Sequence, residues 1–306
     1  MPRSLLVGTS SGVFVVANGD RAVLDPAFGK RGVTWLSVGR DGQVVAVADR
    51  RSIVGRDASG TWTELARSDQ LEIDCVLATP NGVLAGTDEA HVLRLGEDGS
   101  LTRDEAFDAV EGRDAWYTPW GGPPAVRSMA LDLAGRFHAN VHVGGIPRSI
   151  DGGASWEPTI EIDADVHQVI GHPSEPDVVL AAGAVGLAIS EDGGASWRVE
   201  REGLHSSYSR AVAVAGDTIL LTAATGPHGG RGAVYRTTIA GGRFERCDDG
   251  LPEWFDGNID SGWLAADGST VAFGTSDGDV FVSEDAGRRW ARAAEELPRI
   301  RALAFG

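Results

Sequence analysis

The 306-residue sequence contains only two cysteines, Cys75 and Cys247, which excludes a disulfide framework and a cysteine zinc site. It has no run of about 18 consecutive apolar residues, so we expect no membrane-spanning segment. Basic residues are few: 27 Lys and Arg stand against 44 Asp and Glu, and the net charge is −17. Because this charge repels phosphate, we expect neither nucleic acid nor an anionic membrane as a partner. The apolar stretch near the N terminus is too short for a secretion signal, and we expect a cytoplasmic protein.

Glycine, in contrast, is abundant. The 42 glycines make up about twice the usual share of about 7%, which is typical of many tight turns between short strands. One motif recurs in this glycine-rich background: positions 149–156, 190–197 and 283–290 each read S-x-D-x-G-x-x-W. Weaker copies end at Trp62 and Phe244.

The chemistry of this motif is local. The Asp side chain can accept hydrogen bonds from backbone N–H groups of the following residues, and Gly permits the backbone conformation of a tight turn. The Trp then packs under the turn. Trp156 and Trp197 are 41 residues apart, and Phe244 and Trp290 are 46 apart. A period of about 40–47 residues with strands throughout is typical of one four-stranded propeller blade.

The motif and its spacing resemble the Asp-box repeats, also called bacterial neuraminidase repeats, of β-propellers. The stretch 126–238 is also similar to bacterial sialidase-like and YVTN-type repeat proteins. Apolar inner strands begin near positions 35, 74, 127, 167, 210, 262 and 301, which predicts an all-β, seven-bladed propeller with four-stranded blades over residues 1–306. We expect the strand at 301–304 to join the strands at 4–9 and 13–16 and so close the ring.

The propeller topology also predicts which loops share a face. Loops that lead into inner strands, and loops between second and third strands, lie on one face, here called the top. The repeated motifs lie between third and fourth strands, on the opposite face, and we expect them to be structural. Residues 103–125 form a long inserted loop that we expect over the top face. Its Trp116 and Trp120 are candidate residues for stacking on a ligand.

Three histidines from neighbouring blades are expected on the top face: His142, His167 and His205. In one interpretation they bind a divalent transition metal (Zn, Fe, Ni or Cu), with Asp165 or another carboxylate completing the site. In a second they bind an organic anion together with nearby arginines. In a third they satisfy buried polar groups in the narrow channel. The sequence leaves all three open.

The starts of other inner strands contribute further candidates. Arg127, Arg210 and Arg301 are candidate clamps for an anion, and Asp74 occupies the equivalent position in another blade. Candidate catalytic groups on the same face are Tyr208, as a proton donor, Asp165 and His228.

Sialidases resemble the chain in their Asp boxes and use three arginines with a Tyr–Glu pair. They have six blades, however, and no Glu is placed here to activate Tyr208. The sequence therefore predicts a small-molecule-binding propeller with a top-face pocket lined by His and Arg. Hydrolase or lyase chemistry on an anionic or sugar-like ligand is expected if the protein is an enzyme, which the sequence does not decide. The alternatives are a protein-interaction or assembly scaffold and a sialidase-like glycoside hydrolase.

Overall fold

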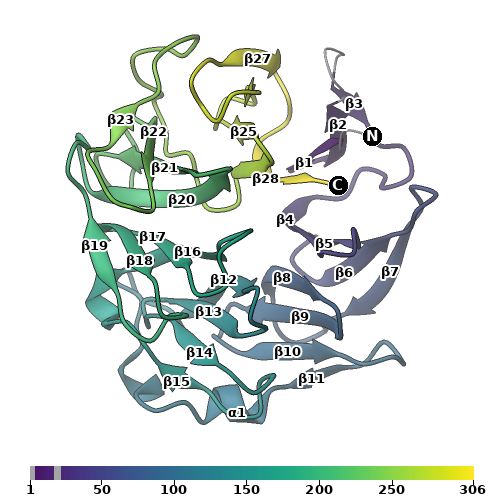
Figure 1. The fold of residues 1–306 in the computed structure, drawn as a ribbon. Helices are drawn as coiled ribbons and strands as arrows, with labels where there is room; N and C mark the ends of the chain where they lie inside the picture. The colour runs from purple at the N-terminus through teal and green to yellow at the C-terminus, as the bar shows by residue number, and fades with distance from the viewer. Residues whose placement is uncertain (1–3, 17–21) are drawn as a thin grey trace.

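The computed structural model describes residues 4–16 and 22–306 and confirms the predicted all-β propeller. Seven antiparallel sheets of four strands each are arranged around a central axis (Figure 1). Residues 1–3 and 17–21 of the predicted domain lie outside the described residues. Within the described part of the chain, helix is confined to α1 (Glu105–Asp108) and two 3-10 turns. No helix there is long and apolar enough to cross a membrane.

Each sheet runs from an inner first strand to an outer fourth strand. The first strands are β4 (Val33–Val38), β8 (Ile73–Thr79), β12 (Ala125–Leu131), β16 (Val166–Gly171), β20 (Tyr208–Ala215), β24 (Leu264–Asp267) and β28 (Ile300–Phe305). The second strands are β5 (Val44–Ala48), β9 (Gly82–Thr87), β13 (Phe137–His142), β17 (Val179–Gly183), β21 (Thr218–Ala224), β25 (Thr270–Gly274) and β1 (Leu5–Thr9). The third strands are β6 (Ser52–Arg56), β10 (Val92–Leu95), β14 (Pro147–Ser149), β18 (Gly186–Ser190), β22 (Ala233–Thr238), β26 (Val280–Ser283) and β2 (Gly12–Val16). The fourth strands are β7 (Trp62–Arg67), β11 (Leu101–Arg103), β15 (Glu157–Pro158), β19 (Arg198–Glu200), β23 (Glu245–Arg246), β27 (Ala291–Ala294) and β3 (Val23–Leu24).

The two ends of the chain share one sheet, as predicted. The C-terminal strand β28 is the inner strand of the sheet β28-β1-β2-β3 and pairs antiparallel with β1, with Val7 opposite Leu303. In Figure 1 the yellow end of the chain accordingly lies beside the purple start. Both Val7 and Leu303 are buried in the same apolar cluster, so this pairing closes the ring through packing as well as hydrogen bonds.

The repeated S-x-D-x-G-x-x-W segments form the expected turns. In the second copy, Asp192 Oδ1 accepts hydrogen bonds from the N–H groups of Ala195 (3.0 Å) and Ser196 (2.8 Å), while Oδ2 accepts one from the Ser196 hydroxyl (2.6 Å). These bonds stabilise the carboxylate and lower the pKa of Asp192 to about 2. The Asp151 and Asp285 copies accept equivalent bonds from backbone N–H groups.

The strand register separates these turns from the predicted top face. Ser149, where the first copy begins, pairs with Phe137 at the start of β13, whereas His142 ends the same strand. At about 3.3 Å per residue, five residues separate the two ends of β13 by about 16 Å. The turns therefore lie at the opposite end of the blades from the candidate site.

The inserted segment 103–125 packs onto the blade that follows it. It begins with α1, whose first turn is capped by Asp104 accepting a hydrogen bond from the Phe107 N–H. Farther along, Tyr117 and Val143 exchange two backbone hydrogen bonds of 3.0 and 2.8 Å. These bonds hold the segment against the loop that follows His142 and so bring it to the top face.

We predict that the closing strand contributes strongly to stability. Replacing Leu303 by Ala removes a side chain that is only 5% exposed, and we expect the free energy of unfolding to fall by about 2–4 kcal/mol. The measurement is urea unfolding followed by tryptophan fluorescence. The matched control is Val23→Ala on β3 of the same sheet, where Val23 is 63% exposed and the change should stay within about 0.5 kcal/mol. Equal effects of the two substitutions would contradict the closure.

Candidate functional site

Backbone pairing is interrupted near the top of the first strand in six of the seven blades. Each register shift leaves at least one residue of the first strand outside the ladder, and such bulges commonly redirect a side chain. The residues left out are Thr34, Asp74, Arg127, His167, Arg210 with Ala211, and Arg301. Five of them, all except Thr34 and Ala211, are residues that the sequence predicted for the site.

Charged side chains at or near these bulges interact electrostatically with one another between blades. The guanidinium of Arg127 interacts electrostatically with Asp74 of the preceding blade and with Arg210 two blades away. It also interacts with Asp260 and Asp165, which precede the first strands of two other blades. Arg127 and groups from four other blades therefore lie close enough to interact at this level.

Three potential metal ligands lie together within this group. The ligand atoms of His142, Asp165 and His167 are all within 4.8 Å of one another. Asp165 Oδ1 is 3.0 Å from His142 Nε2 and 3.8 Å from His167 Nε2. Both histidines are only 1% exposed, while the Asp165 side chain is 25% exposed. The cluster is therefore buried on the protein side and reached by solvent at the carboxylate.

The hydrogen bonds of the cluster leave its facing atoms without partners. His167 Nδ1 lies 2.7 Å from the Ser209 carbonyl oxygen, which requires a proton on Nδ1 and a lone pair on Nε2. His142 Nε2 and Asp165 Oδ1 are in polar contact at 3.0 Å, but neither these two atoms nor His167 Nε2 has a hydrogen bond of ordinary geometry to a described residue. One ligand placed between these three facing atoms would contact all of them.

Burial and charge set the protonation of these groups. Burial is the main reason that the pKa of His167 is lowered to about 4, and neighbouring Asp165 only partly opposes it. Burial would raise the pKa of Asp165, but the imidazoles of His142 and His167 outweigh it, and the pKa falls below its usual value. At neutral pH the cluster thus presents a neutral imidazole of His167 and an ionised carboxylate, the forms that bind metal ions.

The backbone holds Asp165 in this position. Asp165 follows a 3-10 turn (Ile162–Ala164) and has a φ of 46°, a left-handed conformation that Asp tolerates better than most residues. Its carbonyl oxygen accepts a hydrogen bond from the Ala184 N–H (3.0 Å). The loop passes so close to Gly183 that a Cβ there would come within 2.8 Å of the Ala164 carbonyl oxygen. Glycine at position 183 is therefore required by the close approach of the Asp165 loop.

A row of rings crosses the same level of the propeller. The Trp120 ring lies 5.3 Å from that of His142, His142 lies 5.5 Å from His167, and His167 lies 4.8 Å from Tyr208. Trp120, from the inserted segment, is 61% exposed. The inserted loop therefore places Trp120 beside the cluster, in ring contact with His142.

Tyr208 and Arg210 form a fixed pair next to this row. Arg210 donates to the Tyr208 hydroxyl oxygen from Nη2 (2.9 Å) and to Asp260 from Nη1 (2.8 Å). Because the Tyr208 oxygen accepts this bond, its own proton remains available for another acceptor. Burial raises the pKa of Tyr208, so the hydroxyl stays protonated at neutral pH.

Residues 261–262, which the sequence analysis considered only as the start of an inner strand, make contacts next to the site. The Ser261 hydroxyl donates to the carbonyl oxygens of His167 (3.1 Å) and Arg210 (3.0 Å), which belong to two different blades. The Gly262 N–H donates to Gln168 Oε1 (3.3 Å), and a Cβ on Gly262 would come within 3.0 Å of the Trp35 ring. Residues 261–262 therefore extend between inner strands next to the site. No local motif marks them, because their partners are 51 and 94 residues away.

Other predicted residues lie elsewhere. His205 is not in the cluster: its Nδ1 lies 2.7 Å from the Tyr235 hydroxyl, and its ring packs 4.7 Å from Trp254, towards the outer strands of its blade. Its loop reaches the top face but turns outward before β20 begins. His228 is exposed on the turn between β21 and β22. Arg301 occupies a bulge position but is exposed.

Trp116 also differs from its predicted role. It is buried against Phe107 and beneath the Arg113 guanidinium, and a Cβ on Gly144 would come within 2.8 Å of its ring. Trp116 therefore anchors the inserted loop in the core rather than facing a ligand.

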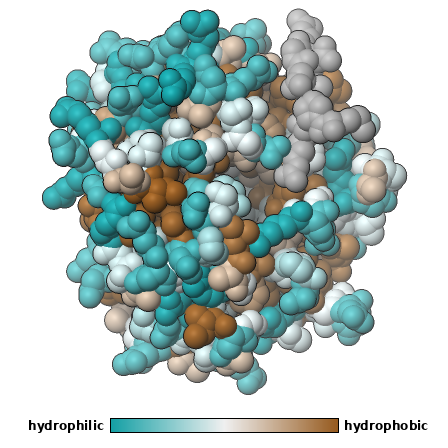
Figure 2. All heavy atoms as spheres, viewed as in Figure 1, coloured by the Kyte–Doolittle hydropathy of each residue, from teal (hydrophilic) through white to brown (hydrophobic). Residues whose placement is uncertain are grey.

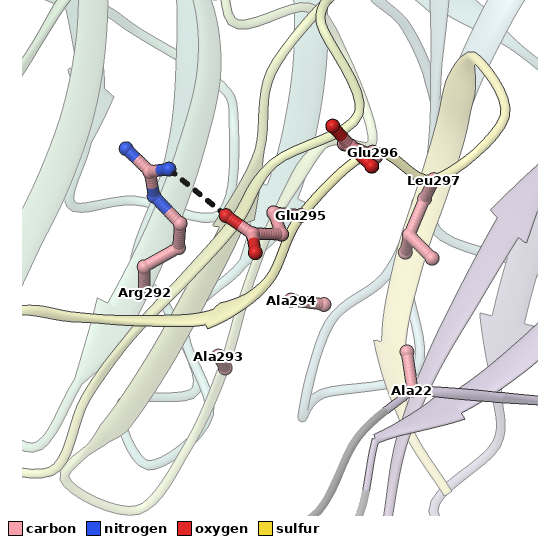
Figure 3. Close-up of a pocket in the computed structure, with 7 residues that line it drawn as sticks. All are labelled: Ala22, Arg292, Ala293, Ala294, Glu295, Glu296 and Leu297. Atoms are coloured by element: carbon pink, nitrogen blue, oxygen red, sulfur yellow. Dashed lines mark hydrogen bonds and ion pairs between the residues drawn. The ribbon is translucent and has the colours of Figure 1, made fainter.

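A cavity of about 500 Å³ lies apart from this cluster, between β27 and the start of β3 (Figure 3). It is lined by Ala22 and residues 292–297, and Figure 3 shows Arg292 paired with Glu295 on one side, with Leu297 and Ala22 on the other. It contains none of the residues that the sequence predicted for the site.

Comparison with known proteins shows the fold but no family. No family model matches the chain, and no curated protein matches its sequence. Among solved structures, a GH74 xyloglucanase from Xanthomonas campestris is similar with a TM-score of 0.58 and 20% identity over 85% of this chain. A GH74 enzyme from Niastella koreensis gives 0.62 and 16%, also over 85%. YCF48 bound to a D1 peptide gives 0.57 and 16% over 85% of this chain and 81% of its own.

These identities support a shared propeller fold and nothing finer. The chain spans 45% of the length of each of the two GH74 enzymes, so their whole-protein architecture is larger than the part that is matched.

We predict that His167 of the metal-free protein is neutral at pH 7, carries its proton on Nδ1 and titrates at about pH 4. In the unfolded chain a histidine has a pKa near 6.5. Protonation therefore favours the unfolded state, and the fold loses roughly 3 kcal/mol as the pH falls from about 6.5 to about 4. Long-range ¹H–¹⁵N NMR spectra of the imidazoles, recorded with chelator present, measure both properties. A titration near pH 6.5, or a proton on Nε2, would show that the site is not built as described.

Proposed function

We propose that this propeller binds one divalent transition-metal ion on its top face, through His142 Nε2, His167 Nε2 and Asp165 Oδ1, for hydrolase or lyase chemistry on a small anionic or sugar-like molecule. One observation carries the proposal: three buried ligand atoms, within 4.8 Å of one another, have no hydrogen-bond partner. A single cation between them would satisfy all three.

The chemistry of the donors supports a metal of the Zn or Fe type. Two imidazoles and one carboxylate are a common ligand set for catalytic Zn²⁺ and for non-haem Fe²⁺, and both leave positions open for water or substrate. A bound metal of this kind lowers the pKa of its water or polarises a substrate oxygen. Asp165, whose side chain is 25% exposed, is the ligand through which the buried cluster borders the solvent.

The surrounding residues have distinct tasks in this proposal. The Ser209 carbonyl keeps the proton of His167 on Nδ1, and so keeps Nε2 available. Trp120 shields His142 from the solvent side. Tyr208 supplies a proton donor beside the cluster, and its hydroxyl is positioned by Arg210.

A glycoside hydrolase mechanism has less support, despite the GH74 likeness. Such an enzyme needs two carboxyl groups facing the substrate from opposite sides of the bond that breaks. Asp74 is bound to Arg50 (2.9 Å) and Asp260 to Arg210 (2.8 Å). Two of the candidate carboxylates are thus already engaged by arginines, and a third, Asp165, lies within the histidine cluster.

A peptide-binding scaffold is the second candidate function. It is favoured by the exposed Trp120 and Tyr117 on the inserted loop, which are 61% and 45% exposed. On the face seen in Figure 2, however, hydrophilic residues predominate, and apolar residues form small separate patches. Such a surface offers less apolar area for a protein partner than a dedicated interaction platform would.

We predict about one metal ion per chain after reconstitution of chelator-treated protein with Zn²⁺, Fe²⁺ or Co²⁺. His142→Ala, His167→Ala and the isosteric Asp165→Asn should each lower the stoichiometry severely, because each removes one of three ligands. Inductively coupled plasma mass spectrometry measures the content, and the visible absorption of the Co²⁺ form reports nitrogen ligands.

His205→Gln and His228→Gln are the matched controls, since each removes an imidazole outside the cluster and should leave the metal content unchanged. Circular dichroism shows whether each variant is folded. If the wild-type protein binds no metal after reconstitution, or if the controls lose it as readily as the cluster variants, the proposal is overturned.

A further inference from the structure

Arg127 is a mostly buried cation without a partner. Among the described residues, none forms a hydrogen bond or an ion pair with its guanidinium, although Asp74, Asp260 and Asp165 act on it at longer range. The bulge between Val126 and Ser128 leaves Arg127 out of the β12–β13 ladder. A guanidinium remains charged even where burial lowers its pKa, as here. Arg127 is partly exposed and its guanidinium has no carboxylate of the described residues at contact distance, so an anionic ligand could reach it and form a charge-assisted hydrogen bond.

The neighbouring cations do not share this property. Arg210 is bound to Asp260 (2.8 Å) and Arg50 to Asp74 (2.9 Å). In each pair a carboxylate already balances the guanidinium at contact distance. Arg127, in contrast to Arg210 and Arg50, has no carboxylate in the described part of the chain within ion-pair distance of its guanidinium.

Arg127 lies close enough to the metal position to interact electrostatically with Asp165. It contributes to lowering the pKa of Asp165, and Asp165 in turn acts on Arg127. The two side chains come from different blades and lie at the same level of the propeller. A ligand of a few heavy atoms can therefore contact both the guanidinium and the cluster of His142, Asp165 and His167.

We propose that Arg127 binds the carboxylate of a small monoanionic molecule, and that a neighbouring hydroxyl or carbonyl oxygen of the same molecule reaches the metal position. The contact with the metal position rests on the proposed function, whereas carboxylate binding by Arg127 does not. The planar guanidinium matches a carboxylate with two parallel hydrogen bonds. The single unbalanced positive charge, close to Asp74 and Asp260, suits a monoanion and disfavours the dianionic form of phosphate.

The test is isothermal titration calorimetry at low ionic strength with four probes: acetate, glycolate, inorganic phosphate and the neutral acetamide. We expect acetate to bind both the metal-free and the Zn²⁺-loaded protein, and glycolate to bind the loaded form more tightly because its hydroxyl adds a metal contact. Arg127→Gln should weaken both carboxylates by about tenfold or more without changing the metal content. Arg127→Lys keeps the positive charge but loses the planar guanidinium, so its affinity for the carboxylates should lie between those of the wild-type protein and Arg127→Gln.

Arg243→Gln is the matched control, because its side chain is 74% exposed on an outer turn and its loss should leave both affinities unchanged. Acetamide binding as tightly as acetate, phosphate binding more tightly than acetate, or unchanged affinities in Arg127→Gln would each overturn the inference. The same holds if no carboxylate binds at tens of millimolar. If acetate binds through Arg127 while no metal binds at all, the carboxylate site is supported and the proposed metal chemistry alone fails.

Discussion

The interruption of backbone pairing at the top of the inner strands is the constraint on which the candidate site depends. A closed ring of seven sheets brings all inner strands around one axis, and a bulge in six of them leaves residues without a ladder partner at one common level. His167 and Arg127 owe their positions to these bulges. Because the ring is closed by β28 and β1, the positions cannot drift apart unless a blade separates. Rigid placement of this kind is what a metal or anion site requires.

The two ends of each blade have different physical tasks. At the far end, Asp192 and its equivalents accept backbone hydrogen bonds within single turns, so their charges are used locally. At the top end, His142 Nε2, Asp165 Oδ1 and His167 Nε2 are buried without hydrogen-bond partners among the described residues. Unpartnered buried groups destabilise a fold, whereas capped turns stabilise it. Stability and the candidate chemistry are therefore separated along the strands, at opposite ends of β13 and its equivalents.

The repeat spacing was sufficient to predict the blades and their closure, because turn chemistry and strand periodicity are local properties. It also placed Arg127 and His167 together, since equivalent positions in a ring converge. It could not separate His205 from the cluster, because a loop can reach the top face and still turn outward to Tyr235. The supporting role of Ser261 was likewise hidden, since its partners lie up to 94 residues away. Loop direction and long-range backbone contacts depend on packing that no short motif records.

The strongly acidic composition makes these short-range contacts decisive. A net charge of −17 attracts a divalent cation to the protein over long distances but repels an anion. A cation therefore needs only ligands at the site, which the His–Asp–His cluster offers. An anion is attracted only when it is within a few ångströms of a positive charge that no carboxylate balances, because the solvent screens more distant positive charges. Asp74 and Asp260 each neutralise one arginine at contact distance. The local field that an anion meets is thus set by Arg127, and by a metal ion if one is bound.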